Sequence, residues 1–73
     1  MADEIEVQLN GDWRTIPDGL SVQELLEYLE LEGGRIAVEV NRKIVRQADW
    51  SNWKIGVNDE IEIVHFVGGG TGE

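Results

Sequence analysis

The first third of the chain carries a strand pattern, a turn signal and a second strand pattern. Apolar and polar residues alternate over residues 4–9, with the apolar ones on one face, which predicts a half-buried strand. Asn10-Gly11 follows, and this dipeptide favours a tight hairpin turn because both positions tolerate positive φ. A second strand is therefore predicted over residues 13–16, paired antiparallel with the first and ended by Pro17, Asp18 and Gly19.

A helix pattern begins at Ser21. Glu24 lies three residues later, which is the spacing of a capping box, in which each side chain bonds the backbone N–H of the other residue. Apolar residues then recur at helical spacing and form a single stripe, made of Val22, Leu25, Leu26 and Leu29. Glycine readily adopts the left-handed conformation that ends many helices, so Gly33-Gly34 is the predicted end of this one.

The second half of the chain predicts three more strands. Alternation over residues 36–40 indicates a third strand, residues 41–43 a turn, and residues 44–46 a short fourth strand. Residues 47–53 are predicted to form a one-turn helix or a packed loop, in which Trp50 and Trp53 cover the open end of a thin core. The last predicted strand covers residues 60–66, with Ile61 and Ile63 on its core-facing side.

This order of elements predicts one α+β domain over residues 1–66. A single amphipathic helix must bury its apolar stripe, and a mixed sheet of four or five strands offers the face on which it can do so. A hairpin followed by a crossover helix is the arrangement of the β-grasp (ubiquitin-like) roll. Because crossovers are right-handed, we expect either the third strand parallel to the first or the last strand beside it.

Composition and charge narrow the function. A chain of 73 residues has little room for both a core and an enclosed catalytic pocket. It has no cysteine and one histidine, His65, so we predict neither a catalytic nor a metal-binding residue. The formal charge of −9 disfavours nucleic acid and anionic membranes and favours a basic protein partner. Without a recognisable signal peptide or spanning stretch, the expectation is a cytoplasmic carrier or binding module.

Residues 67–73 differ in character from the rest, because four of the seven are glycine. Glycine has no side chain to pack and loses the most backbone entropy on ordering, so we expect a flexible tail after the last strand. One interpretation is a frayed chain end. The other is a tail that threads a narrow channel of a partner, where any Cβ would collide with the walls, and that presents an unhindered carboxylate.

The end of the chain resembles a known family. The run Ile63-Val64-His65-Phe66-Val67-Gly68-Gly69-Gly70 is similar to the C-terminal end of the ThiS family, the sulfur carriers of thiamine biosynthesis. The likeness extends over residues 5–70. Residues 22–26, 38–41 and 44–45 add weaker support, because any β-grasp domain shares such patterns.

The resemblance implies a carrier on which other enzymes act and which is not itself an enzyme. In the family, a ThiF-like adenylyltransferase uses ATP to activate the terminal glycine carboxylate, and sulfur from a cysteine desulfurase then replaces AMP. A ThiG-like thiazole synthase takes the sulfur from the resulting thiocarboxylate. Carried over to this sequence, Gly70 is the terminal glycine, Gly68 and Gly69 are the threading glycines, and no bound cofactor is expected.

Thr71-Gly72-Glu73 departs from the family's pattern, because its members normally stop at two or three glycines. A terminal glutamate has a bulk and a charge that should not enter a glycine-width channel. Either a protease removes the three residues, or they are an addition to the natural chain, or this copy of the carrier is inactive. The sequence leaves these alternatives open.

The last strand also suggests a docking patch. If Ile61 and Ile63 face the core, then Val64 and Phe66 face outward, next to Val67 at the root of the tail. A solvated sheet face is ordinarily polar, so we predict that these three apolar residues bind the adenylyltransferase. The competing interpretation is that Phe66 folds over the sheet edge and belongs to the core.

Other functions remain open at this stage. A molybdopterin-type sulfur carrier shares the fold and the diglycine end, but such chains are usually longer and carry a proline-containing run before the glycines, which this sequence lacks. A non-carrier β-grasp interaction module is another alternative, and a ubiquitin-like modifier conjugated to lysines is a third.

Overall fold

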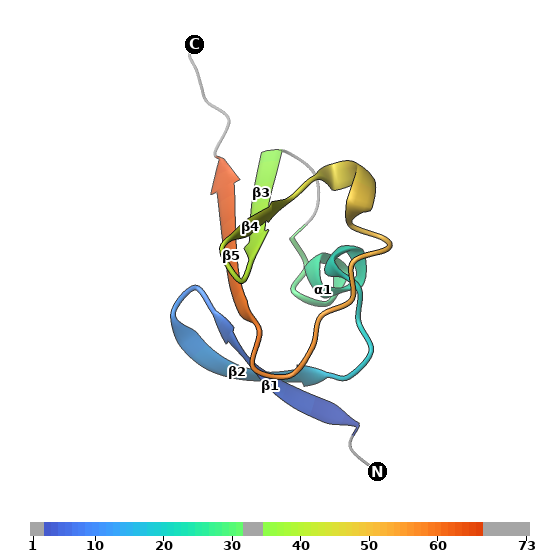
Figure 1. Ribbon diagram of the computed structural model, residues 1–73, viewed down its shortest axis with the longest axis vertical. Helices are drawn as coiled ribbons and strands as arrows, with labels where there is room; N and C mark the ends of the chain where they lie inside the picture. Colours follow the sequence, from blue (N-terminus) through green and yellow to red (C-terminus); the bar gives the residue numbers. More distant parts are fainter. Residues whose placement is uncertain (1–2, 32–34, 67–73) are drawn as a thin grey trace.

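The computed structural model describes residues 3–31 and 35–66. Within these residues the elements follow the predicted order (Figure 1). In chain order they are β1 (Glu4–Leu9), β2 (Asp12–Pro17), α1 (Val22–Tyr28), β3 (Arg35–Val40), β4 (Lys43–Val45), the 3-10 helix η1 (Gln47–Asp49) and β5 (Glu60–Phe66). The strands form one mixed sheet in the order β2-β1-β5-β3-β4, so the predicted α+β roll is confirmed.

Both hairpins of the sheet turn through two left-handed residues. β1 and β2 pair antiparallel along their whole length, and β2 is one residue longer at each end than predicted. Between them, Asn10 has a φ of 51° and Gly11 a φ of 89°. The turn between β3 and β4 uses Asn41 at 53° and Arg42 at 71°. Positive φ at both central residues matches the twist of a two-residue hairpin, which explains the two tight turns.

Helix α1 begins as predicted. The Ser21 hydroxyl accepts a hydrogen bond from the Glu24 N–H at 3.1 Å, and the Ser21 N–H donates to Glu24 Oε1 at 2.9 Å. Both bonds of the capping box are therefore present. They satisfy two N–H groups that have no partner within the helix.

The predicted end of the helix at Gly33-Gly34 is wrong. The last helical residue is Tyr28, and the two glycines lie outside the described residues. Glu30 takes the left-handed conformation that ends the helix, at a φ of 62°, and the Leu31 N–H donates to the Leu26 carbonyl at 2.8 Å. Leu31 also packs against the core. Burial of this leucine therefore offsets the left-handed glutamate, so the turn does not need glycine.

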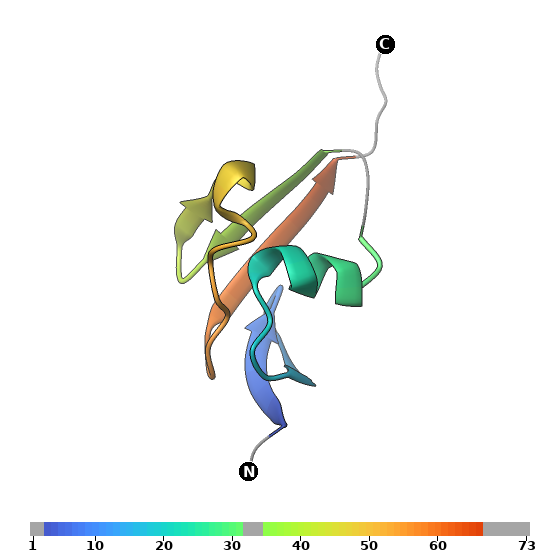
Figure 2. The same ribbon diagram turned by 90° about the vertical axis from the view of Figure 1, so that its right-hand side faces the viewer.

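The centre of the sheet is β5. It pairs antiparallel with β3 along its whole length and parallel with β1 through only two residue pairs, Gln8 with Glu60 and Leu9 with Ile61. The last strand therefore lies beside the first, which was one of the two expected crossover arrangements. Figure 2 shows β3 and β5 running side by side past α1, and in both views their far ends extend beyond the β1–β2 hairpin.

The core lies between α1 and one face of the sheet. Its buried residues are Val7, Ile16, Val22, Leu25, Leu26, Val38, Val40, Val45, Trp50, Ile55, Ile61 and Ile63. The Trp50 indole N–H donates to the Val45 carbonyl at 3.0 Å, so this polar group stays paired although the side chain is buried. Trp53 packs against the same cluster. The prediction that the two tryptophans cover the core is confirmed.

Candidate functional site

The C-terminal end of β5 presents apolar side chains to solvent. Ile61 and Ile63 are buried in the core, whereas Val64 is 50% exposed and Phe66 is 52% exposed. Successive residues of a strand face opposite sides of the sheet, so Val64 and Phe66 lie on the face turned away from α1. The alternative that Phe66 folds back into the core is wrong, because half of its surface is open to solvent.

The neighbouring strands add two residues to this outward face. Ala37 of β3 lies directly opposite Val64 in the sheet register. Ile44 of β4 is 73% exposed and lies opposite Glu39, two residues along the same face from Ala37. We call the four residues Ala37, Ile44, Val64 and Phe66 the outer patch. Sequence reasoning missed Ala37 and Ile44, because only the register shows which residues of other strands lie beside β5.

Carboxylates border the outer patch on the same face. Glu39 of β3 and Glu62 of β5 lie directly opposite each other. Glu60 lies on the same face, two residues before Glu62 in β5. These three glutamates line a shallow depression together with Gln8, Gly11, Arg42 and Ile61. Like charges directly opposite each other in a sheet destabilise it, so a positively charged partner group would relieve the repulsion. Apolar contact beside negative charge therefore suits a partner surface that is both apolar and basic.

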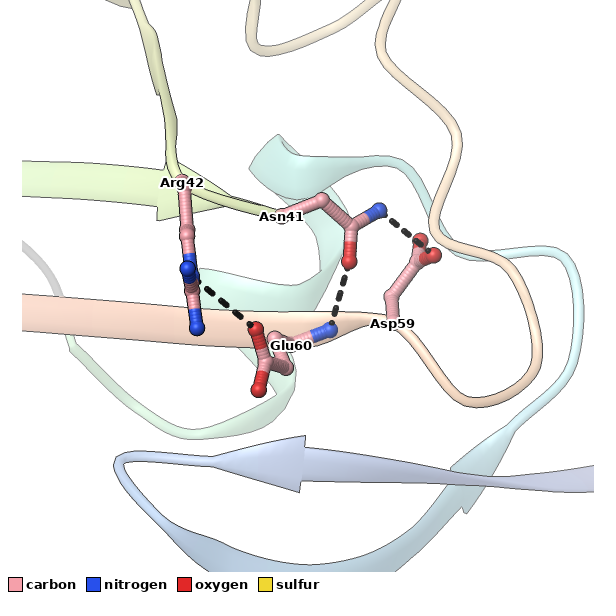
Figure 3. A network of polar contacts seen from close by, with 4 residues as sticks. All are labelled: Asn41, Arg42, Asp59 and Glu60. Carbon is pink, nitrogen blue, oxygen red and sulfur yellow. Dashed lines mark hydrogen bonds and ion pairs between the residues drawn. The ribbon is translucent and has the colours of Figure 1, made fainter.

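A polar network fixes the beginning of β5 (Figure 3). The Asn41 side-chain oxygen accepts from the Glu60 N–H at 3.0 Å, and its Nδ2 donates to Asp59 Oδ1 at 3.0 Å. The other Asp59 oxygen accepts from the Gly56 N–H at 2.7 Å. Arg42 Nε lies 3.8 Å from Glu60 Oε1, but this exposed ion pair adds little. The network holds the β3–β4 turn against the start of β5. It thereby helps to fix the register between β3 and β5, which brings Ala37 beside Val64 in the outer patch.

A second clamp holds the middle of β5. Asn10, in the turn after β1, accepts from the Ile63 N–H at 2.8 Å and donates to the Ile63 carbonyl at 3.3 Å. Its side-chain amide thus does for Ile63 what the next residue of a longer β1 would do. The sequence identified Asn10 as a turn residue, but no sequence signal showed its contact with a residue 53 positions away.

The remaining predicted site residues divide into two groups. Val67, Gly68, Gly69 and Gly70 lie outside the described residues, so their predicted roles stay predictions. His65 is exposed and lies opposite Ile36 of β3. Among the residues that the structure describes, no group of three His, Cys, Asp or Glu side chains is placed to hold a metal ion. No described helix is long and apolar enough to cross a membrane.

Comparison with known proteins points to one family. The family model described as the ThiS family matches residues 7–70. The sulfur carrier protein ThiS of Bacillus subtilis is 40% identical over 65 residues, which cover 88% of this chain and 98% of that protein. An uncharacterized protein, ycf40, of Porphyra purpurea is 36% identical over 66 residues, covering 90% of this chain and 93% of the relative.

Two further similarities extend the comparison. A thiazole synthase of Paramagnetospirillum magneticum is 31% identical over 67 residues, which cover 92% of this chain but only 21% of that larger protein. The crystal structure of a thiamine biosynthesis protein, ThiS, from Geobacter metallireducens superposes with a TM-score of 0.78 at 26% identity. This match covers 90% of the present chain and 100% of the Geobacter chain.

Proposed function

The chain belongs to the ThiS family, and from this membership we infer that it is a sulfur carrier protein of thiamine biosynthesis. A family match over residues 7–70 includes all of the sheet except the first three residues of β1, the helix and the three glycines at positions 68–70. The protein is a carrier rather than a catalyst. Its chemistry therefore depends on the group that it presents and on the partners that act on that group.

We propose that this group is the carboxylate of Gly70. A ThiF-like adenylyltransferase joins the carboxylate to the α-phosphate of ATP and releases pyrophosphate, because a free carboxylate is a poor electrophile. A cysteine desulfurase supplies the sulfur as a persulfide. The persulfide attacks the acyl carbon and AMP leaves, and a thiol then reduces the resulting acyl disulfide, which leaves the thiocarboxylate and a new disulfide. The product is a C-terminal thiocarboxylate. ATP is used by the partner, and the carrier itself needs no bound cofactor.

Gly68 and Gly69 have a steric role in this proposal. A chain end that enters an enclosed adenylylation site must pass the walls of the partner, and glycine has no Cβ to collide with them. The observation that carries the proposal is the family match to Gly70 together with the exposed end of β5, which places the chain at the protein surface four residues before that glycine. Thr71-Gly72-Glu73 would have to be removed before activation.

The outer patch is the proposed docking site for the adenylyltransferase. Val64 and Phe66 are exposed and adjoin the root of the tail, and Val67 follows them in the sequence. The patch would supply affinity by burying apolar area, whereas the net charge of −9 and the glutamates beside the patch would steer a basic partner.

Thiazole synthase is the proposed acceptor of the sulfur. A thiazole synthase of Paramagnetospirillum magneticum contains a segment that resembles almost the whole of this chain, which spans about a fifth of that protein. A carrier and an acceptor joined in one polypeptide meet at high effective concentration, so the fusion supports a functional pair. Here we propose that a separate ThiG-like enzyme accepts the sulfur, in the cytoplasm.

Intact mass spectrometry tests the proposed function. Protein that ends at Gly70 is incubated with the adenylyltransferase, ATP and a sulfur source, and we expect one oxygen to be replaced by sulfur. The matched samples are the chain that ends at Glu73 and the Gly70-ended chain with Gly69→Val. Both should react far more slowly, although their thermal unfolding should be nearly unchanged. Equal reaction of all three samples would contradict the threading role, and conjugation to lysines of other proteins would indicate a modifier instead.

A further inference from the structure

The two edges of β5 differ in how far they are paired. In a strand, the N–H and C=O groups of alternate residues point to the same side. The Glu60 carbonyl accepts from Asn41 on the β3 side, so the even-numbered residues of β5 bond to β3. On the β1 side, the Ile61 carbonyl accepts from Asn10 at 2.8 Å. The odd-numbered residues, Ile61, Ile63 and His65, therefore direct their backbone groups toward β1.

On the β1 side the pairing stops before the strand ends. β1 pairs with Glu60 and Ile61 only, and the Asn10 side chain then bonds both backbone groups of Ile63. Within residues 3–31 and 35–66, the hydrogen bonds on this side of β5 end at Ile63. Figure 1 shows β5 continuing past the turn of the β1–β2 hairpin, with β3 on its other side. With respect to the described part of the chain, the backbone of His65 therefore lies on an open edge.

An open strand edge is a template for another strand. Natural sheets usually protect such an edge with lysine, proline or a covering segment, because unpaired N–H and C=O groups recruit other chains. The strand around this edge reads Val64-His65-Phe66, with neither lysine nor proline, and it continues into the segment that carries Gly70. Val64 and Phe66 also belong to the outer patch, so one partner can contact the patch and the open edge together.

We propose that an extended segment of the adenylyltransferase pairs with the backbone of His65 and adds a strand to the sheet beside β5. This proposal rests on the proposed function, because it assigns the edge to the same partner that docks on the outer patch. Main-chain hydrogen bonds would set the direction in which the chain leaves β5, and the outer patch would supply the apolar contact. The strand addition would thus aim the tail as well as hold the body of the carrier.

A second copy of the chain is a poorer occupant for the same edge. Pairing two copies edge to edge would bring together two molecules that each carry a formal charge of −9. Such self-repulsion opposes association, especially at low ionic strength. A partner with a basic surface meets no such repulsion, and the glutamates on the adjoining face favour it.

Amide hydrogen exchange tests the proposal on the unmodified chain. In the free protein we expect the His65 amide to exchange at least about tenfold faster than the amides of Val64 and Ile63, which have partners within the sheet. In complex with the adenylyltransferase, prepared without ATP so that the tail is not modified, the His65 amide should become protected by about tenfold or more. An His65 amide that exchanges equally fast in the free chain and in the complex would overturn the proposal.

Substitution gives a second, independent measurement. His65→Pro removes the outward N–H but no hydrogen bond to β3, and proline is tolerated at such an edge position. We expect His65→Pro to bind the adenylyltransferase about three- to tenfold more weakly, the effect of losing a single hydrogen bond. The matched control His65→Ala changes the side chain and keeps the N–H, so it should bind like the parent. Equal affinities of the two variants would overturn the proposed strand addition. If His65→Pro does not fold, the exchange experiment on the unmodified chain decides whether the proposal holds.

Further outcomes separate this proposal from the proposed function. If Phe66→Ser weakens binding while the His65 amide stays unprotected in the complex, the docking patch holds and the strand addition is wrong. If the parent chain does not bind the adenylyltransferase at all, both proposals are wrong. Sedimentation velocity of the free chain should show a monomer. A dimer that His65→Pro dissociates would assign the edge to self-association and overturn the proposed partner.

Discussion

The two halves of β5 are neighbours in sequence but differ in how they are held. From Glu60 to Ile63 the strand is paired on both edges, by β3 on one side and by β1 and Asn10 on the other. From Val64 to Phe66 its only pairing among the described residues is with β3, and its side chains are exposed. The first half fixes the position of the strand, and the second half leaves side chains exposed, where we propose that a partner binds.

This difference separates the contacts that stabilise β5 from the exposed part of the strand. The clamps at Asn10 and Asn41 act on the first half of β5, where Ile61 and Ile63 belong to the core. The second half adds little burial, so changes there should affect binding rather than folding. The following experiments test that division.

Shortening a side chain should separate the two halves most strongly. Ile61 is 1% exposed, so Ile61→Ala removes buried apolar volume and should lower the free energy of unfolding by about 2–5 kcal/mol. Val64→Ala is the matched change in the exposed half and should stay within about 0.5 kcal/mol of the parent. Urea denaturation measures both. Similar losses in the two variants would show that the exposed half also supports the fold.

Removal of the Asn10 clamp should have the next largest effect. Asn10→Gly keeps a residue that accepts the φ of 51° but leaves both backbone groups of Ile63 without the side-chain partner. We expect a loss of about 1–3 kcal/mol in stability, together with faster exchange of the Ile63 amide. The control is Asn58→Gly, at another exposed left-handed asparagine with a φ of 66°, which should change stability by no more than about 0.5 kcal/mol. Equal losses of stability at both positions would show that the effect comes from the backbone entropy of the added glycine and not from the hydrogen bonds to Ile63.

Most of the fold could be predicted from the sequence because its elements carry strong local signals. The alternation over residues 4–9, the Asn10-Gly11 turn and the Ser21–Glu24 capping box each act over a few residues, and each prediction is confirmed. The helix end was predicted wrongly because burial of Leu31 outweighs the local preference for glycine. The end of α1 is determined by packing between residues that are distant in sequence, and a local sequence pattern does not contain that information.

The candidate site was predicted less completely for the same reason. Alternation along β5 placed Val64 and Phe66 outward, which their exposure confirms. Ala37 and Ile44 join them only through the pairing of β3 with β5 and of β4 with β3. The contact between Asn10 and Ile63 likewise depends on the crossover that brings β1 beside β5. Roles of Val67 and of the glycines at 68–70 depend on a partner, so neither the sequence nor the fold decides them.

A change at the exposed end should act on binding alone. Phe66→Ser removes an apolar ring that is 52% exposed, so the thermal midpoint should move little. Binding to the adenylyltransferase should weaken about tenfold, or about 1.4 kcal/mol. The control is Tyr28→Ser, which removes a ring of 48% exposure on α1, on the other side of the sheet. Calorimetric titration should show the loss for Phe66→Ser only, and equal losses would place the docking site elsewhere.

The stability of the protein should depend weakly on pH through Glu24, and this dependence can distinguish global from local opening. Hydrogen bonds from Ser21, chiefly from its backbone N–H, lower the pKa of Glu24 below the ordinary range of glutamate. A carboxyl whose pKa is lower in the folded state stabilises the fold above its unfolded value, about pH 4.3. That contribution is lost as the pH falls further through the folded pKa. Glu24→Gln lacks this titration, so its stability deficit relative to the parent should shrink on acidification.

Hydrogen exchange relates this small effect to the two halves of β5. Protection of the Ile61 amide depends on global unfolding, so Glu24→Gln should reduce it slightly near pH 6 and less at pH 4. The His65 amide lies on the open edge and exchanges without unfolding, so the substitution should leave its rate unchanged at both pH values. The Ser21→Ala variant keeps the backbone N–H that chiefly lowers the Glu24 pKa and removes the hydroxyl that caps the helix, so it should reduce Ile61 protection to a similar extent at both pH values. If the His65 amide instead responded as strongly as the Ile61 amide, the two halves of β5 would open together, and the end of the strand would be part of the cooperative core.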